Sequence, residues 1–173
     1  MNVLFLDFDG VLNSKQHYLA TKDFKIKGAS SPDAADLLRM KHDVNSNNMW
    51  VLGYILKQLP ELKIVISSAW GLHYDVEQFK ELFRMFKLDD SRILGITPRK
   101  MSSYRCNEVR WWLADNPDVT NWITVDDHTI FQIEDPEKLN EYTTDSWIGL
   151  TMRDAFKIIQ HFNPSYTEPV LFI

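Results

Sequence analysis

The chain has 173 residues, a formal net charge of −5 at pH 7, 45% hydrophobic residues and one cysteine, Cys106. This length predicts a single domain over residues 1–173, and the ordinary apolar and charged content excludes a largely disordered protein. The sequence has neither a long apolar run nor a signal-peptide pattern, and a lone cysteine suits a reducing compartment. We therefore expect a cytoplasmic protein without a membrane partner, and the composition leaves its oligomeric state and its function open.

Short apolar runs rich in β-branched residues predict four buried strands, at residues 3–8, 63–67, 93–96 and 122–125. Ile148 and the tail 170–173 are weaker strand candidates. Segments with helical periodicity alternate with the strands, at residues 49–59, 76–86, 109–113 and 152–159. Thr151 and Asp154 form a capping-box pattern at the start of the last segment. This alternation predicts an α/β fold with a central parallel sheet that helices cover on both faces.

Residues 14–46 do not follow this alternation. They include several lysines and a helix candidate that Ser31 would cap and Pro32 would begin. We interpret the segment as a short insertion or flap over the carboxyl ends of the strands, where parallel sheets bind their ligands. Its lysines, with His17, Tyr18 and Phe24, could contact a nucleic-acid backbone and stack on a base, or the segment could be a mobile solvated flap.

Two acidic pairs follow predicted strands. Asp7 and Asp9 come after the first strand, and Asp126 and Asp127 come after the fourth. Two such pairs at one sheet edge repel each other unless a cation neutralises them, and carboxylate oxygens suit a hard ion such as Mg²⁺. A solvated acidic turn remains the alternative for the first pair, and a helix-capping role at Thr129 remains the alternative for Asp127.

Other polar residues near the strand ends carry weaker signals. Gly10 allows a tight or left-handed exit from the first strand. Ser67 and Ser68 follow the second strand, where a hydroxyl could donate to an anionic oxygen or merely cap a helix. One cation between the third and fourth strands could neutralise a phosphate while the others are surface charges; the candidates are Arg99, Lys100, Arg105 and Arg110.

Three of these motifs together resemble the haloacid dehalogenase (HAD) superfamily. The run Asp7-Phe8-Asp9-Gly10-Val11 is similar to its first motif, Ser67 after an apolar strand to its second, and Asp126-Asp127 to its fourth. The resemblance covers residues 1–131. It implies a three-layer, HAD-like Rossmannoid fold with a central parallel sheet. Little chain is left for a cap in this sequence, so we expect an open site.

A closer resemblance is to the small HAD domains of Swiss-army-knife RNA-repair proteins, which are relatives of the phosphatase half of polynucleotide kinase-phosphatases. It is carried by residues 9–14, 65–70, 105–113 and 122–127, although Gly71 stands where this subgroup usually has an arginine. The resemblance implies a Mg²⁺-dependent phosphatase for nucleotides or polynucleotide ends. A phosphatase for phosphoproteins or sugar phosphates is the alternative, and a non-catalytic binding module is the third.

The resemblance also implies roles for single residues. Asp7 would be the nucleophile that forms an aspartyl-phosphate, and Asp9 would be the general acid and base. Ser67 and a third-motif cation would bind the phosphoryl group; we choose Arg105 for that cation, with Lys100 and Arg99 in reserve.

The remaining implied roles concern binding. The metal would be held by Asp7, the Asp9 carbonyl, Asp126 and Asp127. The substrate contacts would include Gly10, Ser68, Trp70 and Lys100. Among the histidines, only His128 is expected near the site, because it follows the second acidic pair.

Overall fold

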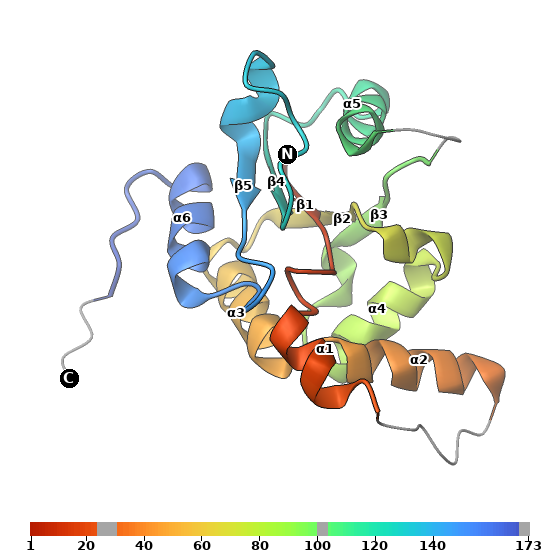
Figure 1. The fold of residues 1–173 in the computed structure, drawn as a ribbon. Helices are drawn as coiled ribbons and strands as arrows, with labels where there is room; N and C mark the ends of the chain where they lie inside the picture. Colours follow the sequence, from red (N-terminus) through yellow and green to blue (C-terminus); the bar gives the residue numbers. More distant parts are fainter. Residues whose placement is uncertain (24–30, 100–103, 170–173) are drawn as a thin grey trace.

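The computed structural model describes residues 1–23, 31–99 and 104–169. Its centre is a five-stranded sheet with the order β3-β2-β1-β4-β5, in which every neighbouring pair is parallel (Figure 1). The strands are β1 (Asn2–Leu6), β2 (Leu62–Ile66), β3 (Ile93–Ile96), β4 (Asn121–Asp126) and β5 (Glu141–Thr143). The predicted α/β class with a central parallel sheet is therefore confirmed.

The four strands expected from apolar runs are all present, and the differences lie elsewhere in the sheet. β5 was not predicted, because its three residues form no apolar run and are partly buried or, at Thr143, exposed; pairing with β4 defines this strand. Ile148 lies in a turn in which its N–H donates to the Asp145 carbonyl, so the weak strand candidate there is wrong. The other candidate, residues 170–173, lies outside the described residues.

The α-helices of the described chain include every predicted one and one more, α1. They are α1 (Lys15–Thr21), α2 (Pro32–Asp43), α3 (Ser46–Gln58), α4 (Val76–Met85), α5 (Arg105–Asp115) and α6 (Met152–Phe162). Ser31 caps α2 through the Ala34 N–H at 3.1 Å, and Thr151 with Asp154 forms the capping box of α6. Both caps agree with the sequence patterns that predicted them.

The sheet separates two hydrophobic cores, and its central strand β1 contributes side chains to both. Leu4 and Leu6 point to the larger core, which contains the inner faces of α3, α4 and α6. Val3 and Phe5 point to the opposite face, where they meet Val109 of α5. This alternation follows from the two-residue period of a strand, and Figure 1 shows α5 on the side of the sheet away from α3 and α4. The result is a three-layer arrangement.

The segment 14–46 contains α1 and α2, and its described parts pack against the rest of the molecule. α2 contacts both α1 and α4, and Met40 of α2 is fully buried. The described part of the segment is thus helical, with α2 packed into the core and α1 exposed on the surface, while Phe24, Lys25 and Lys27 lie outside the described residues. Within the described chain, the helices are all too short or too polar to cross a membrane.

Candidate active site

The carboxyl ends of the central strands bring the two acidic pairs together, as their positions in a parallel sheet predict. Leu6 pairs with Ile66 of β2 and with Val125 of β4, so the residues that follow these three strands meet at one level. The Asp7 N–H donates to the Val125 carbonyl at 3.0 Å, and the Ser67 N–H donates to the Leu6 carbonyl at 2.8 Å. The backbone hydrogen bonds between these strands thus continue into the site.

Asp7 is a buried carboxyl, with 5% of its surface exposed. Burial raises the pKa of Asp7 to about 7; the Arg105 charge opposes this rise, the Asp126 carboxylate adds to it, and a hydrogen bond with Ser68 opposes it. The side chain therefore lies in a place where a negative charge is costly unless a cation compensates it.

Arg105 is the cation that the structure places against this carboxyl. Its Nη1 lies 3.3 Å from Asp7 Oδ1 and 3.7 Å from Asp126 Oδ2, so one guanidinium serves both acids. Arg105 is the first residue of α5, which aims its side chain at the sheet edge.

The other candidate cations have different places. Arg99 pairs with the buried Glu108 at 3.5 Å, and Arg110 pairs with Asp135 and Glu137 at 2.9 Å each. Lys100, also expected to contact the substrate, lies outside the described residues. Arg105 is thus the one of these four that reaches Asp7 within the described chain.

The second acidic pair forms a cluster with His128. Their potential ligand atoms lie within 4.8 Å of one another. Asp126 is buried, which raises its pKa, and its Oδ1 accepts the His128 N–H at 2.9 Å. Asp127 Oδ1 lies 2.6 Å from His128 Nδ1, and this contact raises the pKa of the exposed histidine. The position of His128 agrees with the prediction. The capping alternative for Asp127 is wrong, because the helical turn that follows β4 begins at Pro136.

Gly10 is required by its surroundings. Its φ is +73°, in the left-handed region, and a Cβ at this position would overlap the side chain of Asp127. Any other residue would therefore separate the two acidic motifs. The close approach also explains why the glycine directly follows the second acid of the first motif.

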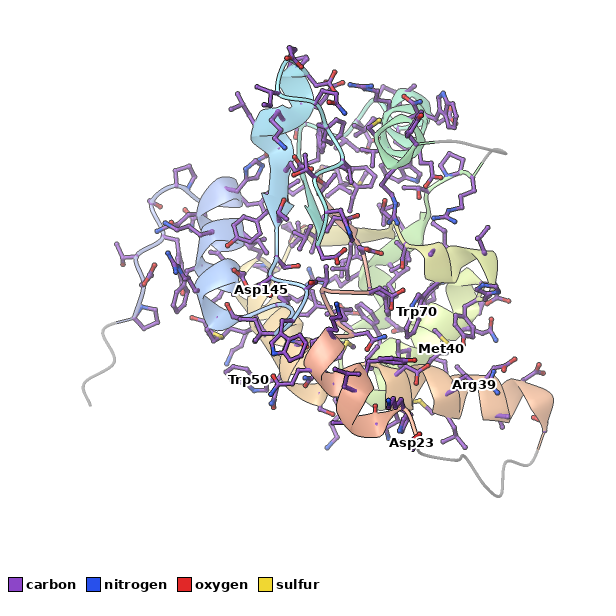
Figure 2. All side chains as sticks on the ribbon, in the orientation of Figure 1. Asp23, Arg39, Met40, Trp50, Trp70 and Asp145 are labelled. Carbon is purple, nitrogen blue, oxygen red and sulfur yellow. The ribbon has the colours of Figure 1, made fainter. Side chains whose placement is uncertain are left out.

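Asp9 has surroundings unlike those of Asp7. Its side chain is exposed, and its Oδ1 accepts two hydrogen bonds, from Trp70 Nε1 at 3.1 Å and from Asn13 Nδ2 at 3.0 Å. Trp70 is only 9% exposed and lies in the interior of the molecule (Figure 2). The structure thus brings Trp70, expected to contact the substrate, into contact with the acid of the first motif.

The two serines after β2 also differ. Ser67 is buried, and its Oγ has no hydrogen-bond partner among the described residues. Ser68 Oγ caps the turn η1 (Ala69–Leu72) by accepting the Trp70 N–H at 3.3 Å, and its hydroxyl also hydrogen-bonds Asp7. A buried hydroxyl without a partner costs free energy, so Ser67 is the one available for an added oxygen ligand.

Sequence reasoning missed Thr144, which ties the two acidic motifs together. Its Oγ1 donates to the Gly10 carbonyl at 2.9 Å, and its N–H donates to the Asp126 carbonyl at 3.0 Å. Thr144 directly follows β5, so the polar residue after a strand was again the signal, but the strand itself was not recognised. The contact of Asn13 with Asp9 is likewise not indicated by any pattern in the sequence.

A cavity of about 400 Å³ lies beside Asp9 and Asp127. Its lining residues are Asp9, Gly10, Asn13, Lys15, Tyr18, Asp127, His128 and Ser146. Lys15 and Tyr18 belong to α1, and both are exposed. His17, another ring expected to contact nucleic acid, does not line this cavity, and its Nε2 lies 2.8 Å from the His42 carbonyl oxygen.

Comparison with known proteins gives one family and two structures. Residues 3–155 match the family described as the HAD domain in Swiss Army Knife RNA repair proteins. The HAD domain of effector protein Lem4 from Legionella pneumophila matches at 18% identity, covering 91% of this chain and 93% of that chain, with a TM-score of 0.48. An inactive mutant of that domain matches at 17% identity, covering 91% and 92%, with a TM-score of 0.49. No curated protein matches.

Proposed function

Because this chain belongs to the family of HAD domains in Swiss Army Knife RNA repair proteins, we propose that it is a Mg²⁺-dependent phosphatase for nucleotides or polynucleotide ends. The family supports phosphatase-type chemistry in general. The observation that carries the proposal is the buried Asp7 carboxyl held 3.3 Å from Arg105 at the carboxyl edge of the sheet. A nucleophile next to a cation is the arrangement that attack on an anionic phosphoryl group requires.

The donor set suits a divalent cation. Asp7 and Asp126 are both buried, each has a raised pKa, and both contact the single charge of Arg105. Carboxylate and carbonyl oxygens are the ligands that Mg²⁺ prefers. We expect Asp7, the Asp9 carbonyl and Asp126 to hold the ion, with Asp127 adjacent. When bound, Mg²⁺ would screen the nucleophile from the negative phosphoryl oxygens.

The proposed reaction has two steps. In the first, an Asp7 oxygen attacks phosphorus and forms an aspartyl-phosphate, while Asp9 gives its proton to the leaving oxygen. In the second, Asp9 takes a proton from water, and the water oxygen attacks the same phosphorus to release phosphate and free Asp7. Ser67 donates its otherwise unpartnered hydroxyl to a phosphoryl oxygen, and Arg105 neutralises the charge that these oxygens carry.

The cavity beside Asp9 supports a nucleotide as the substrate. Since Asp9 delivers the proton to the leaving group, the cavity that Asp9 lines is where the rest of the substrate would lie. There Lys15 supplies a positive charge for a neighbouring phosphate, and the exposed Tyr18 supplies an aromatic face for a base.

A substrate panel tests this proposal. Phosphate release would be measured from 3′- and 5′-phosphorylated oligonucleotides, nucleoside monophosphates, a sugar phosphate and a phosphopeptide, with Mg²⁺ and with EDTA. We expect Mg²⁺-dependent turnover that is fastest on a nucleotide or an oligonucleotide end. Activity confined to the sugar phosphate or the phosphopeptide would overturn the substrate class, and no turnover of any monoester would overturn the enzyme.

A further inference from the structure

The Asp9 carboxyl is held asymmetrically. Both of its hydrogen-bond donors, Trp70 Nε1 at 3.1 Å and Asn13 Nδ2 at 3.0 Å, converge on the same oxygen, Oδ1. The donors come from two segments that are far apart in the chain, the turn after β2 and the loop after β1. An oxygen that accepts two N–H groups has no room for a proton of its own, so the free oxygen of this carboxyl is Oδ2.

Trp70 is fixed in place from several sides. Its ring lies 4.8 Å from the ring of Phe8, the residue between the two acids of the first motif, and 5.7 Å from that of Tyr74. Its backbone N–H donates to Ser68 Oγ, which itself hydrogen-bonds Asp7. A buried ring with these contacts has one orientation, and its single N–H therefore defines one position for the Asp9 oxygen.

Asn13 supports the same geometry. It directs its amide nitrogen to Asp9, and its own Oδ1 is buried without a hydrogen-bond partner among the described residues. A buried amide oxygen without a partner is unfavourable, so the contact with Asp9 determines how this side chain is oriented.

We propose that Trp70 is a positioning residue for the reaction, which with Asn13 holds Asp9 by Oδ1 so that Oδ2 exchanges the proton with the leaving group. This inference rests on the proposed function, since it concerns the proton that Asp9 gives to the leaving oxygen. In this inference the tryptophan after the second motif acts by orienting the Asp9 carboxyl and not by binding the substrate. The leaving group departs with the Oδ2 proton as an alcohol, and Oδ2 regains a proton from water in the second step.

Trp70→Phe tests this role, because phenylalanine keeps a ring against Phe8 and removes the N–H. The kcat and KM would be measured on p-nitrophenyl phosphate, whose leaving group needs little protonation, and on a nucleoside monophosphate, whose alkoxide needs it. We expect kcat on the nucleotide to fall by about 10- to 100-fold with KM nearly unchanged, because general acid catalysis typically contributes about 10²–10⁴-fold and the acid itself remains. On p-nitrophenyl phosphate we expect a much smaller loss.

Matched variants separate positioning from packing. Trp122→Phe removes a tryptophan that packs on Phe5 in the other core, and it should leave the ratio of the two activities unchanged. Asn13→Ala removes the second donor without touching the core, and it should shift the ratio as Trp70→Phe does. Circular dichroism would show whether Trp70→Phe is folded. If it is not, Asn13→Ala still tests the positioning of Asp9. In an Asp9→Asn background, Trp70→Phe should cause no further loss on the nucleotide.

The outcomes distinguish this inference from the proposed function. Equal losses on both substrates, or no loss, would overturn the positioning role while leaving the phosphatase intact. A further loss in the Asp9→Asn background would also overturn it. A wild-type protein that hydrolyses neither substrate with Mg²⁺ would overturn the proposed function, and the positioning role with it.

Discussion

The inner and outer parts of the site contain neighbouring acids in opposite surroundings. The inner part consists of Asp7, Arg105 and Asp126, where buried charges face one another at 3.3 and 3.7 Å. The outer part consists of Asp9, Asn13 and Trp70, where the exposed Asp9 carboxyl accepts hydrogen bonds from the uncharged N–H groups of the other two residues. One residue separates the two acids in the chain. Environment, and not residue type, therefore distinguishes the two proposed roles, a nucleophile in the inner part and a proton carrier in the outer part.

The largest effect should follow removal of the inner nucleophile. Asp7→Asn should lower kcat by about 10³-fold or more on every monoester, because no covalent intermediate can form whatever the leaving group. Steady-state phosphate release would measure it. The control is Asp115→Asn, an exposed position at the end of α5 that should leave the activity unchanged. Retained activity in Asp7→Asn would remove this residue as the nucleophile.

Removal of the outer acid should depend on the substrate, unlike removal of the inner one. Asp9→Asn should lower kcat by about 10²–10⁴-fold on a nucleoside monophosphate and by much less on p-nitrophenyl phosphate. Comparing the two substrates with the same preparation provides the internal control. If both losses were as large as those of Asp7→Asn, the division between an inner and an outer part would not hold.

The cation of the inner part should have a smaller but general effect. Arg105→Ala should lower kcat by about 10²-fold on both substrates, because a charge that stabilises the phosphoryl oxygens acts regardless of the leaving group. The comparison variant is Lys100→Ala, for which we expect a far smaller loss. The reverse order would transfer the third-motif role to Lys100.

The smallest expected effect is on stability, and its sign depends on pH. The pKa of Asp7 is raised to about 7 in the folded protein, above its value in the unfolded chain. The folded state therefore keeps a proton that the unfolded state releases, and the stability that Asp7 contributes falls as the pH rises from about 4 to 7. Without metal, Asp7→Asn should thus increase the free energy of unfolding at pH 8 by about 1–3 kcal/mol, and by less at pH 5.

Chemical denaturation at the two pH values would measure this difference. Adding Mg²⁺ should stabilise the wild type more than Asp7→Asn, since the ion compensates the buried charge that the variant lacks. A variant less stable than the wild type at pH 8 would contradict the stated cost of the Asp7 charge.

The sequence carried enough information to predict which residues of the inner part meet, and it named Asp9 and Trp70 of the outer part, but it did not indicate the hydrogen bonds that join the outer residues. Asp7 follows the short apolar strand β1 and Asp126 ends the short apolar strand β4, and the geometry of a parallel sheet brings residues at these strand ends together. Trp70 packs against the rings of Phe8 and Tyr74 in the core, and no local sequence pattern predicts this packing. β5 escaped prediction for a similar reason, since its pairing with β4 and not its composition makes it a strand.

Thr144 links the edge strand β5 to the candidate active site. The sequence motifs of the site end at Asp127, but Thr144 lies beyond them, directly after β5. Its two hydrogen bonds, to the Gly10 carbonyl and to the Asp126 carbonyl, join the loops of the two acidic motifs. A short edge strand is where a sheet opens most readily. Each transient opening of β5 would release both loops at once, so hydrogen exchange at this edge would report how often the assembled site comes apart.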